Sequence, residues 1–175
     1  NGLSDDSRRI RAGDLFLACS GNKTNGARFV ADAIDNGAVA IVYEAESLSA
    51  GNDALSKVPA FAVADLKKKL GDIAARFYGE PSRDLLVIGV TGTNGKTSCC
   101  HFLAQALNNE QSPCGVIGTL GYGLFGHLHA GQHTTPDAIT LQSLLADFRE
   151  AGARYVVMEV SSHGLDQGRV AGVMF

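Results

Sequence analysis

The sequence has no excess of basic residues. Among its 175 residues, 15 are Lys or Arg and 18 are Asp or Glu, so the formal net charge is −3. A nucleic-acid-binding surface would be basic. The one basic run, 67–69, is more typical of a solvated helix face than of a binding patch. We therefore expect no nucleic-acid partner.

A membrane-spanning segment is also absent from the sequence. No apolar stretch reaches the roughly 18 residues that a transmembrane helix requires, and no signal-peptide pattern follows Asn1. The four cysteines, Cys19, Cys99, Cys100 and Cys114, show no metal-ligand spacing and no C-x-x-C pair. Reduced thiols in the cytoplasm are the simplest explanation. We expect a cytoplasmic monomer that does not insert into membranes.

Internal repeats and low-complexity tracts are missing too, and the composition is globular, with 45% hydrophobic and 19% charged residues. Strand-like runs alternate with helix-like stretches, which predicts an α/β fold with a mostly parallel sheet. The expected strands are 15–19, 38–43, 59–63, 85–88, 115–119 and 155–160, and the expected helices are 27–36, 66–78, 99–107 and 137–151. The glycine-rich stretch 122–132 is predicted to be a mobile loop.

A break at 79–82, Gly-Glu-Pro-Ser, predicts a domain boundary. Residues 1–82 would form a small α/β domain, and residues 83–175 would form a second domain around the main motif of the chain.

That motif runs from Gly89 to Thr97, with the sequence GVTGTNGKT. It lies between a predicted strand and a predicted helix, which is the context of a phosphate-binding loop. Lys96 can reach terminal phosphates, and the Thr97 hydroxyl is the expected first protein ligand of Mg²⁺. Val90 stands where the common pattern has its first glycine. The alternative is a glycine-rich turn with a solvated lysine, but the context favours a nucleoside triphosphate site.

Glu159 ends an apolar strand that comes after this loop in the chain. A carboxylate there can hold Mg²⁺ against nucleotide phosphates, directly or through water. The alternative is an acid that caps the next turn. A strand-end acid is what a two-part metal site requires, so we favour the metal role.

Two further polar segments have open interpretations. Residues 133–136 precede a helix and could face an anionic ligand, or could simply start that helix. Residues 6–9, Asp-Ser-Arg-Arg, could bind a phosphate through arginine, although a surface ion-pair cluster is the more common arrangement. None of the five histidines has metal-ligand spacing with a partner.

Together these segments resemble the Mur ligases of peptidoglycan synthesis. The resemblance rests on four ordered motifs, 6–8 with 13–16, 92–97, 134–136 and 158–165, and extends to residue 169. The sequence EVSSHGL at 159–165 is the discriminating motif. The resemblance implies an ATP-dependent ligase with Mg²⁺, which phosphorylates the D-Glu carboxylate of UDP-MurNAc-L-Ala-D-Glu. The amine of a diamino acid, meso-diaminopimelate or L-lysine, then attacks the acyl phosphate.

The resemblance also implies roles for individual residues. Lys96 and Glu159 are the expected catalytic residues, with Thr97 and Glu159 at the metal. The expected ATP-binding residues are Gly92, Thr93, Asn94, Gly95, Lys96, Thr97 and Ser98. Ser7 would contact the uridine nucleotide, with Asp5, Asn22, Lys23 and Thr24. The muramoyl-peptide end would be held by His133, Thr134, Thr135, Ser161, Gln167 and Arg169. His133 stands where the family often has Asn, and His163 is expected to give structural support.

Members of this family are longer than this chain. The resemblance therefore implies a fragment with a UDP-MurNAc-peptide-binding domain (1–82) and an incomplete ATP-binding domain (83–175), without the C-terminal domain and with little turnover alone. The alternatives are the Mur ligase that adds D-Ala-D-Ala, a folylpolyglutamate synthetase, and a non-catalytic module that senses UDP-muramoyl peptides.

Overall fold

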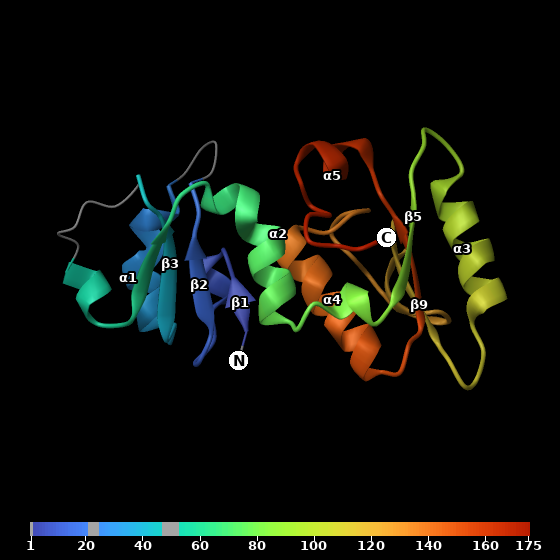
Figure 1. Cartoon of the computed structure of the whole chain (residues 1–175), viewed down its shortest axis with the longest axis horizontal. Helices are drawn as coiled ribbons and strands as arrows, with labels where there is room; N and C mark the ends of the chain where they lie inside the picture. Colours follow the sequence, from blue (N-terminus) through green and yellow to red (C-terminus); the bar gives the residue numbers. More distant parts are fainter. Residues whose placement is uncertain (1, 21–24, 47–52) are drawn as a thin grey trace. The chain divides into compact units, whose positions relative to one another are not determined.

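The computed structural model describes residues 2–20, 25–46 and 53–175. It shows a mixed α/β chain that divides into two compact units, Asn1–Lys69 and Leu70–Phe175 (Figure 1). The division lies inside helix α2 (Leu66–Phe77), so it precedes the break at 79–82. No helix of the described residues is both long and apolar enough to cross a membrane.

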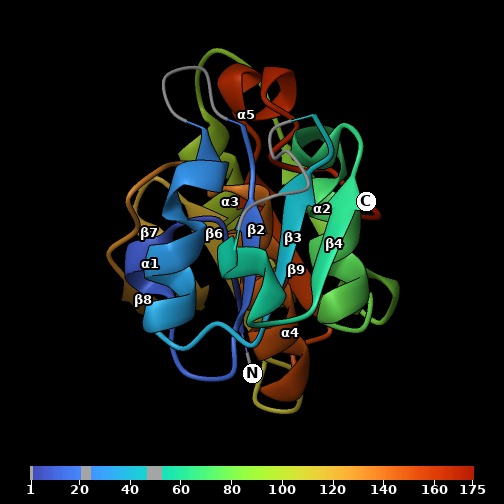
Figure 2. The same cartoon turned by 90° about the vertical axis from the view of Figure 1, so that its left-hand side faces the viewer.

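Unit 1 contains a sheet of four parallel strands, in the order β1 (Leu3–Ser4), β2 (Leu15–Ala18), β3 (Ala40–Glu44) and β4 (Ala60–Val63). Its short helices are η1 (Ser7–Arg9), η2 (Gly26–Phe29), α1 (Val30–Asp35) and η3 (Asp53–Ser56). In Figure 2, β2, β3 and β4 lie side by side, with α1 on the viewer's side of the sheet. Phe16, Val30 and Ile41 are among the buried residues that join helix and strands into one core.

The predicted helix 27–36 begins as a 3₁₀ turn and becomes α-helical only at Val30. The Asn25 side chain accepts a hydrogen bond from the Ala27 N–H (3.0 Å), which satisfies one of the free donors at the helix start. Gly37 follows the helix with φ of +100°, a conformation that favours glycine. Asn25 and Gly37 therefore mark the start and the stop of the helix expected at 27–36.

Unit 2 contains a five-stranded sheet in the order β5 (Leu86–Val90), β9 (Tyr155–Glu159), β6 (Cys114–Gly118), β7 (Gly121–Leu124) and β8 (His127–His129). β5, β9 and β6 are parallel, whereas β7 and β8 are antiparallel. The helical segments are η4 (Pro81–Arg83), α3 (Lys96–Leu107), α4 (Ala138–Glu150) and α5 (Ser162–Asp166).

The two faces of this sheet are covered by different helices (Figure 1). Val156 and Met158 pack with α4, whereas Val157 packs with Cys100 and Ala104 of α3. Successive residues of a strand point to opposite faces, so a strand buried on both faces is apolar throughout. This explains the uninterrupted run Tyr155–Met158.

The prediction of a mobile loop at 122–132 is wrong, because β7 and β8 form an antiparallel hairpin that extends the sheet from β6. Gly121 and Gly123 have φ of +130° and +155°. A Cβ at either position would collide with a carbonyl oxygen of β8, that of His129 or His127. Glycine is required here because the two backbones approach closely. Glycine is uncommon in strands, so the same residues led to the prediction of a loop.

Candidate functional site

The phosphate loop connects β5 to α3, as its sequence context predicts. Gly92 and Gly95 both have positive φ, +141° and +77°, where a side chain is strained. Gly95 is the N-cap of α3, and no side chain within residues 2–20, 25–46 and 53–175 caps the helix. The first backbone N–H groups of α3 therefore remain available to an anion, and the helix dipole favours a negative charge there.

Lys96 is the first residue of α3 and folds back over the loop. Its Nζ donates to the carbonyl oxygen of Gly92 (2.8 Å) and lies 3.4 Å from that of Thr93. No carboxylate within the described ranges forms an ion pair with Lys96. The ammonium is held where phosphate oxygens could replace the loop carbonyls as acceptors.

Glu159 lies beside this loop because β9 is the neighbour of β5, with Val90 and Glu159 in register. Its side chain is 1% exposed. Thr97 Oγ1 lies 3.0 Å from each carboxylate oxygen, and the Thr119 N–H donates to Oε1 (2.8 Å). The alternative that Glu159 caps the next turn is wrong, because the Ser161 side chain caps α5 by accepting from the Gly164 N–H.

The buried Glu159 carboxylate has no cationic partner in the described part of the chain. A buried charge without a counter-charge is costly, so a cation would be stabilised next to it. One carboxylate and the Thr97 hydroxyl fit Mg²⁺, which prefers oxygen ligands and usually keeps waters and nucleotide phosphates in its shell. Across residues 2–20, 25–46 and 53–175, no group of three His, Cys, Asp or Glu side chains could cage a metal alone. Thr97 and Glu159 supply one hydroxyl and one carboxylate, a donor set that suits a metal whose other ligands are phosphates and water.

Several of the predicted peptide-binding residues come together next to Glu159. Thr135 Oγ1 donates to the Glu159 carbonyl (2.9 Å) and accepts from the Ser161 N–H (3.0 Å). Arg169 donates to the Thr135 carbonyl (2.8 Å) and also to Gln167 Oε1. Thr135 is fully buried, so its hydroxyl holds the loop before α4 against the end of β9.

The neighbouring residues His133 and Thr134 are held by the β6–β7 region. The Tyr122 hydroxyl donates to the His133 carbonyl and accepts from its N–H. Thr134 Oγ1 lies 3.0 Å from Thr119 Oγ1. Thr119 and Tyr122 were not predicted as site residues, because position 119 was expected to be the last residue of a strand and 122 belongs to the hairpin that the sequence analysis missed.

The predicted uridine-nucleotide residues belong to unit 1. Ser7 is buried at the start of η1, and Asp5 is exposed. The Asp6 side chain pairs with Arg8 (2.8 Å) and also accepts from the Arg8 N–H. The Arg8 guanidinium lowers the pKa of Asp6. Residues 6–9 thus contain the surface ion pair that the sequence suggested, and Asn22, Lys23 and Thr24 lie outside the described residues.

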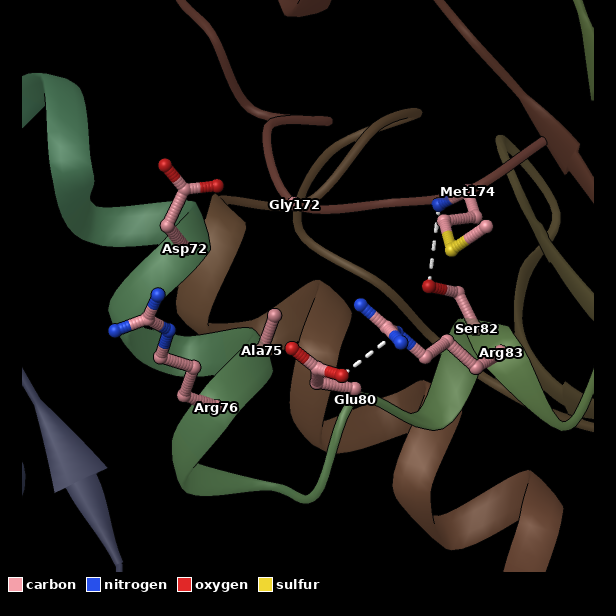
Figure 3. A pocket seen from close by; sticks show the side chains of 8 residues that line it. All are labelled: Asp72, Ala75, Arg76, Glu80, Ser82, Arg83, Gly172 and Met174. Atoms are coloured by element: carbon pink, nitrogen blue, oxygen red, sulfur yellow. Dashed lines mark hydrogen bonds and ion pairs between the residues drawn. The ribbon is translucent and has the colours of Figure 1, made fainter.

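Unit 2 also contains a pocket whose lining includes none of the predicted site residues (Figure 3). It has a volume of about 210 Å³ and is lined by Asp72, Ala75, Arg76, Glu80, Ser82, Arg83, Gly172 and Met174. Glu80 and Arg83 form an ion pair (2.6 Å), and Ser82 Oγ accepts from the Met174 N–H (3.1 Å). The ion pair lies within η4 and its N-cap, and the hydrogen bond joins η4 to the segment 172–174.

The four cysteines, all within the described residues, are free thiols, and we expect only Cys99 to react quickly in the folded protein. Cys99 is exposed, whereas burial raises the pKa of Cys19 and Cys100 to about 12 and that of Cys114 to about 11. A raised pKa leaves less thiolate, on the order of one part in 10³ to 10⁴ at pH 8 for these three. Titration with a chromogenic disulfide should give one fast equivalent. Two or more would contradict this assignment, and Cys99→Ser is the control that removes it.

Comparison with known proteins identifies the family. Residues 90–175 match the Mur ligase middle domain, and residues 1–78 match the Mur ligase family catalytic domain. The chain is 54% identical over 173 residues to UDP-N-acetylmuramoyl-L-alanyl-D-glutamate–2,6-diaminopimelate ligase of Pseudomonas aeruginosa, and 49% identical to the protein of the same name in Coxiella burnetii. Each alignment covers 99% of this chain and 35% of the relative. The chain therefore spans about a third of the length of these relatives.

Solved structures agree with this assignment. A structure of UDP-N-acetylmuramoyl-L-alanyl-D-glutamate–2,6-diaminopimelate ligase matches 98% of this chain with a TM-score of 0.78 and 34% identity, and the match covers 34% of that chain. MurF ligase from Thermotoga maritima in complex with ADP matches 93% of this chain with a TM-score of 0.59 and 25% identity, over 32% of its own length. The chain, with Mur ligase matches over residues 1–78 and 90–175, belongs to the Mur ligase family.

Proposed function

We propose that the complete gene product is an ATP-dependent ligase that joins 2,6-diaminopimelate to the D-Glu carboxylate of UDP-MurNAc-L-Ala-D-Glu. The observation that carries this proposal is the buried Glu159 carboxylate beside Thr97 and the phosphate loop. The choice of substrate is supported by relatives of about 50% identity whose names specify diaminopimelate. Because the substrates are nucleotides, we propose that the reaction takes place in the cytoplasm.

In this proposal residues 83–175 hold ATP. Lys96 and the N-terminal N–H groups of α3 bind the β- and γ-phosphates, where they hold the γ-phosphoryl group for transfer. Mg²⁺ held by Thr97 and Glu159 would neutralise the phosphate charge. Transfer of the γ-phosphoryl group to the acceptor carboxylate gives an acyl phosphate and ADP. The amine then attacks the acyl carbon, and phosphate leaves.

Residues 1–82 bind the uridine nucleotide in this proposal, with Asp5, Ser7, Asn22, Lys23 and Thr24 as its contacts. The exposed His133, Gln167 and the partly exposed Thr134, Ser161 and Arg169 contact the muramoyl peptide. The buried Thr135 acts indirectly, because its hydroxyl positions Ser161 and its carbonyl positions Arg169.

The test is phosphate release by the complete gene product with Mg·ATP. We expect release only when UDP-MurNAc-L-Ala-D-Glu and meso-diaminopimelate are both present, because the acyl phosphate needs both an acceptor carboxylate and an amine to turn over. Coupled spectrophotometry measures the phosphate, and mass spectrometry identifies the amide product.

Three other outcomes would reject the proposal in different ways. Release with L-lysine instead of diaminopimelate would change the amine. Release with UDP-MurNAc-tripeptide and D-Ala-D-Ala would indicate the D-Ala-D-Ala-adding ligase. Binding of the muramoyl dipeptide without any phosphate release would indicate a sensing module.

A further inference from the structure

Thr119 connects two parts of the site that are far apart in the sequence. It follows β6, and its N–H donates to Glu159 Oε1 (2.8 Å) while its hydroxyl donates to Oε2 (3.3 Å). The oxygen of the same hydroxyl lies 3.0 Å from Thr134 Oγ1. Thr119 therefore contacts both the acid beside the phosphate loop and the loop that precedes α4.

The direction of these hydrogen bonds follows from donor counting. A hydroxyl has one hydrogen, and an ionised carboxylate can only accept. Since Thr119 donates its hydrogen to Glu159, Thr134 must donate to Thr119. The order is therefore Thr134 to Thr119 to Glu159, and each bond in such a chain polarises the next.

The end of β6 is shaped to admit the Glu159 carboxylate. Gly118 precedes Thr119, and a Cβ at this position would collide with Glu159 Oε1. The missing side chain lets the carboxylate approach the backbone closely enough to accept from the Thr119 N–H. Thr97 holds the carboxylate from the phosphate-loop side, and Thr119 holds it from the β6 side.

We propose that Thr119 is a positioning residue that orients Glu159 for Mg²⁺ and connects this acid, through Thr134, to the loop that precedes α4. The inference rests on the proposed ATP-dependent function. If the Thr97 hydroxyl bound a metal instead of donating to Glu159, Thr119 would still donate to both carboxylate oxygens of Glu159. Loss of the Thr134 hydroxyl then weakens binding of the metal nucleotide. This effect passes through Thr119, because the only side-chain hydrogen bond of Thr134 in the described residues is to Thr119.

The experiment is calorimetric titration of the complete gene product with ADP, once with MgCl₂ and once with EDTA. Thr119→Val keeps the backbone N–H and the shape but removes the hydroxyl. We expect it to weaken binding of Mg·ADP by about five- to tenfold and to leave binding in EDTA unchanged. Thr119→Ser is the control variant, since it keeps the hydroxyl and should bind Mg·ADP as the unmodified protein does.

The connection to Thr134 has its own test. We expect Thr134→Val to weaken Mg·ADP binding by about two- to threefold, because one bond of the chain is lost. In the Thr119→Val background the same change should have no further effect, since residues that act through one another are not additive. Should Thr119→Val fail to fold, the Thr134→Val and Thr119→Ser titrations alone decide the question.

The outcomes separate this inference from the proposed function. If the unmodified protein binds ADP equally with and without Mg²⁺, the proposed function fails. If its binding depends on Mg²⁺ but Thr119→Val or Thr134→Val binds Mg·ADP as the unmodified protein does, the inference is overturned. A loss that is equal in MgCl₂ and EDTA also overturns it, because that loss would be structural.

Discussion

Replacing Lys96 by alanine lowers the Mg·ATP-dependent phosphate release of the complete protein by about 10²- to 10³-fold, the size of effect expected when a donor to developing charge is removed. Among the residues that the structure describes, the Lys96 ammonium donates only to loop carbonyls, so its removal leaves no buried group of these unpaired. We therefore expect an unchanged melting temperature in the absence of nucleotide. Steady-state kinetics and differential scanning fluorimetry measure the two quantities.

Lys68→Ala is the matched control for this variant. Lys68 is exposed, and its side chain pairs with Asp65 (2.7 Å) on the surface, an interaction that contributes little to stability. We expect near-normal phosphate release from this control. If Lys96→Ala kept more than a tenth of the activity, the loop would be a glycine-rich turn with a solvated lysine, the alternative that the sequence left open.

Replacing Glu159 by glutamine should separate activity from stability. The change removes a buried charge that has no cationic partner among the described residues, so we expect the metal-free protein to be as stable as the original or more stable. The Gln Oε1 can accept from the Thr119 N–H, and its amide can donate to the hydroxyls of Thr97 and Thr119. The loss of the carboxylate should lower Mg·ATP-dependent turnover by about 10²- to 10³-fold.

Thermal unfolding with and without Mg·ADP tests this prediction. Ligand that binds only the folded state raises its stability, so the melting temperature of Glu159→Gln should rise less with Mg·ADP than that of the original protein. Glu150→Gln, at an exposed position on α4, is the control and should behave as the original. A clear loss of stability with full activity would instead assign Glu159 a purely structural role.

Local patterns were sufficient for most elements of this chain. The helices expected at 27–36 and 137–151 are bounded by Asn25, Gly37 and Asp137, residue types that typically start or stop helices. The phosphate loop lies between a strand and a helix as its motif requires. These features depend on residues within a few positions of one another, so they can be predicted before the fold is known.

The hairpin at 121–129 was missed for a physical reason. Gly121 and Gly123 carry no β-strand preference of their own, and their value lies in letting the β8 backbone approach. The pairing of β7 with β8 depends on this close approach, and no alternation of apolar and polar side chains marks it in the sequence.

The sequence by itself determined that this chain is an α/β member of the Mur ligase family with the motif GVTGTNGKT between a strand and a helix. Which side chains meet at that motif was decided by tertiary structure. β9 lies between β5 and β6, although it follows both in the chain, and this order brings Glu159 to Thr97 on one side and to Thr119 on the other. Strand order depends on packing among distant segments, so no local pattern could have identified Thr119.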